Sequence, residues 1–162
     1  MEIAIVSDTH MPRGTRRLPE HCVARLRTAD LILHAGDLVK LCVLQELKSL
    51  GSVIAVHGNV DDAEVQTELP PVRELEAAGA IIGLVHDGGP ARGRLSRLRA
   101  QFPRADAVVF GHSHIPLHEG SPDGFQIFNP GSPTERRRAS ERTMGIARVR
   151  GGEVTFELIG LG

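Results

Sequence analysis

The stretch IAIVSDTH, residues 3–10, begins with four apolar residues, three of them β-branched, and then turns abruptly polar. Four similar runs follow along the chain: LIL before His34, VIAV before His57, IIGLV before His86 and AVVF before Gly111. Short apolar runs that are rich in β-branched residues and bounded by polar or glycine-rich sequence are typical of buried strands. We therefore expect five buried strands, each followed by a polar loop.

Helical patterns separate the first three of these strands. Apolar spacing predicts helices over residues 17–27 and 39–50, and Gly51 follows the second helix as a candidate C-cap. The order strand, helix, strand, helix, strand predicts a parallel sheet with right-handed crossovers. A further helix with a basic outer face is expected within residues 91–102.

The second half of the chain departs from this alternation. Residues 69–88 indicate a strand and a hairpin-like return that begins a second sheet. From Ile115 onward, four short apolar pieces separated by glycine and proline turns predict an antiparallel sheet. A chain of 162 residues can bury a sizeable core as one unit. We therefore expect a single domain over residues 1–162.

The composition excludes several classes of protein. With 41% hydrophobic residues, 24% charged residues and a net charge of -1, neither disorder nor a general attraction to nucleic acid or membranes is indicated. Trp and Tyr are absent, which removes the usual platforms for stacking bases. No apolar run approaches the ~20 residues that span a bilayer, and no signal peptide is evident, so we expect a cytoplasmic protein that could form a homo-oligomer. Cys22 and Cys42 lie in predicted helices, where we expect buried thiols without a function.

Side chains that can bind metal ions follow each of the five apolar runs. They are Asp8 and His10, Asp37, Asn59, His86, and His112 and His114. Ligands in open α/β sheets bind beyond the carboxyl ends of strands, so we expect these seven to converge on one edge. The set contains nitrogen and oxygen donors without a thiolate, which suits Mn, Fe, Co, Ni or Zn. Seven ligands suit two ions that share a carboxylate, as in phosphate hydrolysis.

Five short motifs surround these residues in the order of a known family. SDTH (residues 7–10), GDL (36–38), GNVD (58–61), HD (86–87) and GHSH (111–114) resemble the signature of the calcineurin-like metallophosphoesterases. The short chain and NPGS at residues 129–132 resemble the small YfcE-like phosphodiesterase branch of that family. The resemblance implies an α/β fold, a four-layer α/β/β/α sandwich with mixed sheets and a two-metal site at one end.

The resemblance also implies a role for each matched residue. Asp8, His10 and His114 would hold one metal ion. Asn59, His86 and His112 would hold a second, and Asp37 would bridge both. Asp37, Asn59 and His112 are also the candidate catalytic residues. The family usually uses Mn, with Fe, Ni, Co or Zn as alternatives, and its members hydrolyse phosphoesters. We expect a small phosphodiester substrate, attacked by a hydroxide that bridges the two ions.

The remaining polar residues have weaker assignments. We expect His34 to pack or to support a ligand, and His57 to be the one other histidine that could reach the substrate. His21 and His118 are expected on the surface, and Asn129, Gly131 and Ser132 in a turn beside the site. Arg13, Arg16 and Arg17, and residues 136–138, are expected as solvated loop charges, with the steering of phosphate as the alternative. Many larger relatives have histidine in place of Val60, and that histidine is thought to protonate the leaving group.

Two other functions stay open from the sequence. One is a protein-binding scaffold of the same fold, as in retromer-subunit relatives whose metal pocket has lost ligands. The other is a nuclease, which the near-neutral charge and the lack of stacking aromatics disfavour. The complete ligand set favours catalysis.

Overall fold

The computed structural model describes residues 1–162 and contains two five-stranded sheets and four helices. The first sheet holds β10 (Glu153–Gly160), β9 (Thr143–Arg150), β1 (Glu2–Val6), β2 (Leu31–His34) and β3 (Val53–Ala55), in that order. The second holds β4 (Val72–Ala77), β5 (Ala80–Val85), β6 (Ala107–Val109), β8 (Gln126–Asn129) and β7 (Leu117–Gly120). The helices are α1 (Glu20–Thr28), α2 (Leu41–Leu50), α3 (Ala63–Glu68) and α4 (Arg94–Gln101).

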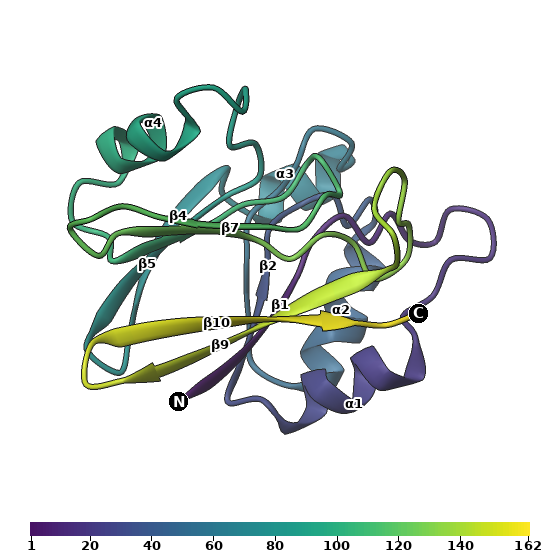
Figure 1. Ribbon diagram of the computed structural model, residues 1–162. Helices are drawn as coiled ribbons and strands as arrows, with labels where there is room; N and C mark the ends of the chain where they lie inside the picture. Colours follow the sequence, from purple (N-terminus) through teal and green to yellow (C-terminus); the bar gives the residue numbers. More distant parts are fainter.

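The two sheets pack face to face, and helices cover their outer faces (Figure 1). Side chains alternate along β1: Ile5 packs between the sheets, whereas Val6 packs against α1, α2 and α3. On the outer face of the second sheet, Leu98 of α4 packs against Val108 of β6. The predicted α/β/β/α sandwich with mixed sheets is confirmed.

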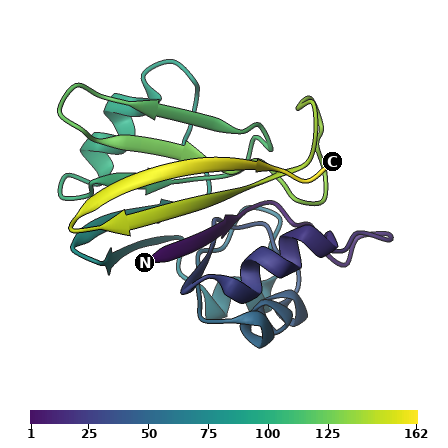
Figure 2. The same ribbon diagram turned by 60° about the horizontal axis from the view of Figure 1, so that its bottom comes forward.

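The pairing of the strands confirms the first half of the prediction and corrects the second. β1, β2 and β3 run parallel, and β4 and β5 form the expected hairpin. The four pieces after Ile115, however, do not form one antiparallel sheet. They form two hairpins: β8 of the first pairs in parallel with β6, whereas β9 of the second pairs with β1 in the other sheet (Figure 2). Turn residues specify a hairpin locally, but burial decides which sheet it joins.

Three predicted features of the helices change for local reasons. The first helix begins at Glu20 rather than at residue 17, since a residue before proline is disfavoured in helical conformation and Pro19 precedes it. The second begins at Leu41, because Val39 is held in a left-handed conformation (φ 92°). Gly51 follows that helix with φ 172°, an extended conformation open to any residue.

Two smaller findings concern the helices. α3 was not predicted, and its start is fixed by Asp62, whose carboxylate accepts a hydrogen bond from the Val65 N–H at 3.1 Å. Cys22 is buried as expected, but the prediction for Cys42 is wrong, since it lies exposed on α2. None of the four helices has both the length and the apolar character needed to span a bilayer.

Replacing Phe128 should test the packing between the sheets. Its ring is 1% exposed and stacks on Phe156 with centroids 4.5 Å apart. Phe128→Ala should lower the free energy of unfolding by about 3–5 kcal/mol, measured by urea denaturation. Leu158→Ala on β10 removes an apolar side chain that is 46% exposed and should change it by less than about 0.5 kcal/mol. Equal losses in the two variants would contradict this account of the core.

Candidate metal centre

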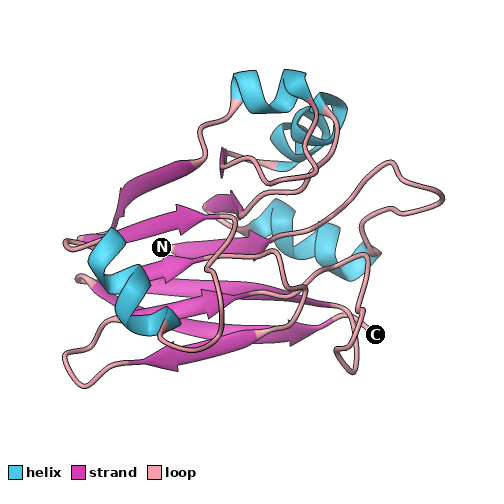
Figure 3. Ribbon diagram, turned by 90° about the horizontal axis from the view of Figure 1, so that it is seen from above, coloured by secondary structure: helices cyan, strands magenta, loops and turns pink.

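The structure brings the seven predicted ligand residues together at one end of the sandwich. They lie in the loops that follow β1, β2, β3, β5 and β6, and Figure 3 shows loops gathering where the strand arrows end. The expectation of a single sheet edge needs a correction, because these strands belong to two different sheets. The loops therefore meet between the carboxyl ends of the two sheets.

Asp8, His10 and His114 form the first cluster. Their ligand atoms all lie within 4.8 Å of one another, and all three residues are buried. The Asp8 Oδ1 atom lies 3.4 Å from His114 Nε2 and 3.9 Å from His10 Nε2. Two imidazoles and one carboxylate thus face a common point, which is a ligand set for a first-row divalent cation.

The second cluster combines Asp37, His86 and His112, with Asn59 beside them. The Asn59 Oδ1 atom lies 3.1 Å from both His86 Nε2 and His112 Nδ1, and these two nitrogens are 3.3 Å apart. His86 is buried, whereas Asn59 and His112 are exposed. This cluster is therefore the side of the centre that solvent can reach.

Asp37 belongs to both clusters through a single oxygen. Its Oδ2 atom lies 3.3 Å from His10 Nε2 and 3.2 Å from His86 Nε2, while its Oδ1 atom accepts a hydrogen bond from the Val60 N–H. Burial by itself would raise the pKa of Asp37, but the contacts with His10 and His86 outweigh burial and hold that pKa below its usual value. The shared group is therefore a carboxylate at neutral pH.

Several buried atoms of the first cluster have no hydrogen-bond partner. These atoms are Asp8 Oδ1 and both ring nitrogens of His114. Unpaired buried polar atoms are costly and need an explanation. Burial raises the pKa of Asp8 to about 6, and burial together with the charge of Arg137 lowers the pKa of His114 to about 4. A cation facing Asp8 and His114 would pair with the carboxylate, and the neutral imidazole is the form that binds metal. The residues therefore fit a divalent ion.

Neighbouring groups fix the orientation of these side chains. The Nδ1 atom of His86 lies 2.7 Å from the carbonyl oxygen of Ala35 and donates to it, so the Nε2 lone pair faces the centre. The Asp8 Oδ2 atom accepts hydrogen bonds from Ser7 Oγ at 2.7 Å and from the His112 N–H at 3.0 Å. The ligand loops are thus tied to one another before any ion binds.

Backbone strain is concentrated in the same loops. Eight non-glycine residues have positive φ, and five of them are predicted ligands: Asp8, His10, Asp37, His112 and His114. Such conformations cost about 1–3 kcal/mol each and persist where the surroundings enforce them, commonly at functional sites. Two glycines allow the close approach of these loops. A Cβ atom on Gly58 would collide with Asp37 Oδ1, and one on Gly111 would collide with Ser7 Oγ.

A family model described as the calcineurin-like phosphoesterase superfamily domain matches residues 1–152. The chain belongs to this superfamily.

Two relatives of this phosphoesterase support the same class, and one solved structure shares its fold. A probable metallophosphoesterase of Methanothermobacter thermautotrophicus is 35% identical over 164 residues, covering 100% of this chain and 94% of the relative. A phosphodiesterase of Methanocaldococcus jannaschii is 26% identical over 143 residues, covering 81% and 83%. Wild-type Vps29 of Entamoeba histolytica, complexed with Zn²⁺, has the same fold, with a TM-score of 0.78 at 20% identity and full coverage of both chains. The chain is therefore a metallophosphoesterase.

Asp61 organises the metallophosphoesterase centre in a way that the sequence did not reveal. It is 4% exposed, and its Oδ2 atom accepts hydrogen bonds from the N–H groups of Asp37 at 3.0 Å and Gly58 at 2.6 Å. Its Oδ1 atom accepts from the Val39 N–H at 2.5 Å. A carboxylate at the end of the GNVD motif was the available signal, but the N–H groups that it binds come largely from another loop.

The other histidines lie as expected. His34 is fully buried; its Nδ1 atom accepts from the Gly36 N–H at 3.1 Å, and its Nε2 atom lies 3.1 Å from Thr9 Oγ1. His34 therefore supports two ligand loops. His21 and His118 are exposed. His57 helps to line a hollow of about 320 Å³ beside the second cluster.

The chain from the end of β8 onward borders the first cluster, as predicted for Asn129, Gly131 and Ser132, although Asn129 is the last residue of the strand and not part of the turn. The Asn129 amide donates to the Gly111 carbonyl at 2.9 Å, and Ser132 Oγ donates to the Asp8 carbonyl at 2.8 Å. Thr134 Oγ1 donates to the Thr9 carbonyl at 2.7 Å. This turn therefore closes over the loop that carries Asp8 and His10.

Asp61→Asn should destabilise the protein. The amide offers one acceptor oxygen where the carboxylate offers two, and each buried N–H left without a partner costs about 1–3 kcal/mol. Urea denaturation should show this loss in the free energy of unfolding. Asp62→Asn is the matched control, because asparagine caps a helix as well as aspartate does and the Lys40 ion pair that it removes is exposed. If both substitutions proved equally mild, Asp61 would not organise these loops.

Acid should destabilise the protein partly through His34. Burial, followed by the charge of His86, lowers the pKa of His34 to about 3, so the folded state resists a proton that the unfolded state accepts near pH 6.5. Its contribution to stability is complete above about pH 6.5 and is lost as the pH falls toward 3, at up to about 1.4 kcal/mol per pH unit.

The effect of His34 on the pH dependence of the unfolding free energy can be measured with chelator present. Asparagine can accept from the Gly36 N–H but does not titrate, so His34→Asn should make the dependence of unfolding free energy on pH shallower between about pH 6 and 4. An unchanged slope would mean that His34 takes up its proton equally in both states, even if the variant were less stable at every pH.

Proposed function

We propose that residues 1–162 form one domain that hydrolyses a small phosphodiester at a two-metal centre. The observation that carries this proposal is the position of Asp37 Oδ2, which lies 3.3 Å from His10 Nε2 in one cluster and 3.2 Å from His86 Nε2 in the other. A carboxylate shared in this way is the usual bridge between two catalytic cations.

The proposed ligands follow the two clusters. Asp8, His10 and His114 would hold one ion, Asn59, His86 and His112 the other, and Asp37 both. The donor set suits Mn, which we propose as the metal, with Fe, Co, Ni or Zn as alternatives. When bound, two divalent cations supply the positive charge that lowers the pKa of water and stabilises negative charge on phosphoryl oxygens.

The protein's own groups would place the substrate. Asn59 and His112 lie on the exposed side of the centre, where a phosphate can approach, and together with Asp37 they are the proposed catalytic residues. The hollow of about 320 Å³ beside them is lined partly by Pro71 and Val72, so it suits an ester group of low polarity. Such a hollow would orient one substituent of a diester while its phosphate faces the clusters.

The finer assignment rests on the short chain and the NPGS motif at residues 129–132, which resemble the YfcE-like branch. The relative named as a phosphodiesterase supports a diester rather than a monoester. Unpaired buried atoms at Asp8 and His114 favour a metal-binding enzyme over a scaffold whose pocket has lost its ligands.

Removal of metal should abolish activity on an activated diester such as bis(p-nitrophenyl) phosphate. Chelation should stop turnover, and Mn²⁺ should restore it. Asp37→Asn should reduce kcat by about 100-fold or more, because removing even an outer partner of a ligand costs about 10–100-fold. Steady-state kinetics with metal analysis of each protein measures both effects.

Asp30→Asn is the matched control for Asp37→Asn. Asp30 is an exposed aspartate immediately before β2, at the end of that strand opposite to Asp37, and it accepts a hydrogen bond from the Glu2 N–H. This control should keep its metal and its activity. Turnover that survived verified removal of all metal would refute the proposal.

Val60 should make the rate sensitive to the leaving group. The histidine that many larger relatives have at this position is thought to protonate the leaving oxygen, and general acid catalysis of this kind is typically worth ~10² to 10⁴ in rate. We expect kcat to fall steeply from nitrophenyl to alkyl esters, and Val60→His to narrow the difference where the ring reaches the leaving oxygen.

The test is kcat across a series of leaving groups of graded pKa. A flat dependence in the parent protein, with phosphorus–oxygen cleavage shown to limit the rate, would mean that another acid is present. His57, which lines the hollow, would then be the first residue to replace.

A further inference from the structure

Two loops beside the metal centre concentrate positive charge. We call them the arginine rim: residues 11–19, which follow β1 and its ligands, and residues 130–142, which follow β8. They carry Arg13, Arg16 and Arg17, residues 136–138, and Arg142. The rim thus holds seven of the 19 Lys and Arg residues but only two of the 20 Asp and Glu, although the whole chain has a net charge of -1. The rest of the chain accordingly has more Asp and Glu than Lys and Arg.

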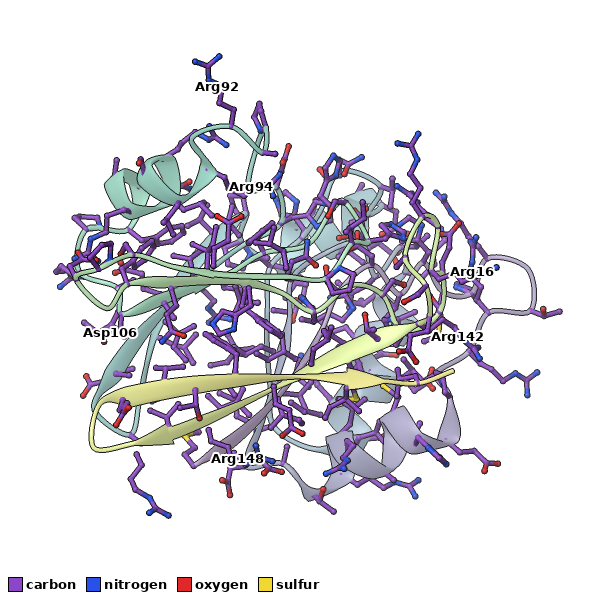
Figure 4. The ribbon with its side chains drawn as sticks, viewed as in Figure 1. Arg16, Arg92, Arg94, Asp106, Arg142 and Arg148 are labelled. Carbon is purple, nitrogen blue, oxygen red and sulfur yellow. The ribbon has the colours of Figure 1, made fainter.

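Both loops of the rim are attached directly to the first metal cluster. The first loop starts immediately after His10, and the Arg13 N–H donates to the His10 carbonyl at 3.1 Å. The second loop is fastened by Thr134, whose Oγ1 atom donates to the Thr9 carbonyl at 2.7 Å. Figure 4 shows the labelled Arg16 and Arg142 at the end of the molecule where the chain terminates, away from Arg148.

Glu135 links the rim to a ligand. Its Oε2 atom lies 3.3 Å from an Nη atom of Arg16 and 3.7 Å from His114 Nδ1. Glu135 therefore connects Arg16 of the rim directly to His114 of the first cluster.

Much of the charge on the rim is uncompensated. Arg13, Arg17, Arg137 and Arg138 are exposed and make no ion pair and no side-chain hydrogen bond. The hollow on the other side of the centre is lined instead by apolar residues such as Pro71 and Val72 and by the acidic Asp87, with no arginine or lysine. The two sides of the centre thus differ in charge, and an anionic group belongs on the side of the rim.

Resting on the proposed function, we propose that the arginine rim binds a second phosphate of the substrate. The preferred substrates are then phosphodiesters that carry a further phosphate on one ester arm, with the less polar arm over the hollow. Guanidinium groups pair with phosphate oxygens through two parallel hydrogen bonds and keep their charge at any working pH. A cleft edge of one sign also raises the rate at which an anionic ligand arrives.

A matched pair of substrates tests this proposal. The p-nitrophenyl ester of thymidine 5′-phosphate can be prepared with and without a phosphate on its 3′ oxygen, so the reacting bond and the leaving group stay the same. With Mn²⁺, the parent protein should show a KM about tenfold lower for the 3′-phosphorylated ester. This advantage should shrink between about 50 and about 300 mM NaCl, because salt screens exposed charges.

Variants of the rim provide the second part of the test. Arg137→Ala and Arg138→Ala, singly and together, should bring the KM ratio of the two esters toward one. Arg150→Ala is the control: this exposed arginine ends β9 beyond the first residue of β1, at the opposite end of that strand from the ligands, and the KM ratio should stay near ten. Calorimetric binding of thymidine 3′,5′-bisphosphate and thymidine 5′-phosphate gives a readout that needs no turnover. The bisphosphate should bind about tenfold more tightly than thymidine 5′-phosphate. This difference should be present only in proteins with an intact rim.

The outcomes separate this inference from the proposed function. If both esters are hydrolysed with equal KM and both nucleotides bind equally, the rim does not hold a second phosphate, while hydrolysis of the diester stands. If the lower KM of the 3′-phosphorylated ester persists in the double variant, the rim is likewise not the site of the second phosphate. If neither ester is hydrolysed but tighter binding of the bisphosphate depends on Arg137 and Arg138, the anion site stands and the proposed function fails.

Discussion

One carboxylate oxygen, Oδ2 of Asp37, connects the two halves of the metal centre. It lies within 3.3 Å of His10 Nε2 and His86 Nε2, which follow strands of different sheets. That contact exists only while the two sheets are packed face to face at a fixed separation. The core between them, built around side chains such as Ile5, Leu84 and Phe128, therefore determines the geometry of the site.

The centre is held in a state that is costly without an ion. Five of the predicted ligands have strained backbones, and Asp8 and His114 leave buried atoms without partners. Much of the compensation comes from backbone N–H groups gathered on a carboxylate, as at Asp61, and from glycines that allow the loops to approach. A preformed centre of this kind loses little freedom on binding, which favours tight binding of the ions.

Much of the architecture could be predicted from the sequence, because the five buried strands combine an apolar run with an abrupt polar end. The candidate ligand residues could be picked out for the same reason, since each follows such a strand. The sheet that each late hairpin joins could not be predicted, because β8 and β9 have similar apolar content and differ only in their partners. Asp61 was missed because its role depends on N–H groups of another loop, which no local pattern reveals.

The arginine rim shows how function depends on the arrangement of two distant segments. From the sequence, both arginine groups were expected as solvated loop charges, with the steering of phosphate only as the alternative. Folding joins residues 11–19 and 130–142 through the ion pair of Arg16 with Glu135, and Thr134 fastens the second segment to Thr9, so that both groups of charges lie on one side of the centre. In this proposal, the two sides of the centre bind different parts of one substrate.

The most direct test of the central claim is anomalous diffraction from crystals of the Mn²⁺-loaded protein. The account predicts two manganese peaks per chain, about 3.5–4 Å apart, with Asp37 in contact with both. A single peak, or two peaks of which only one contacts Asp37, would contradict the shared-carboxylate centre.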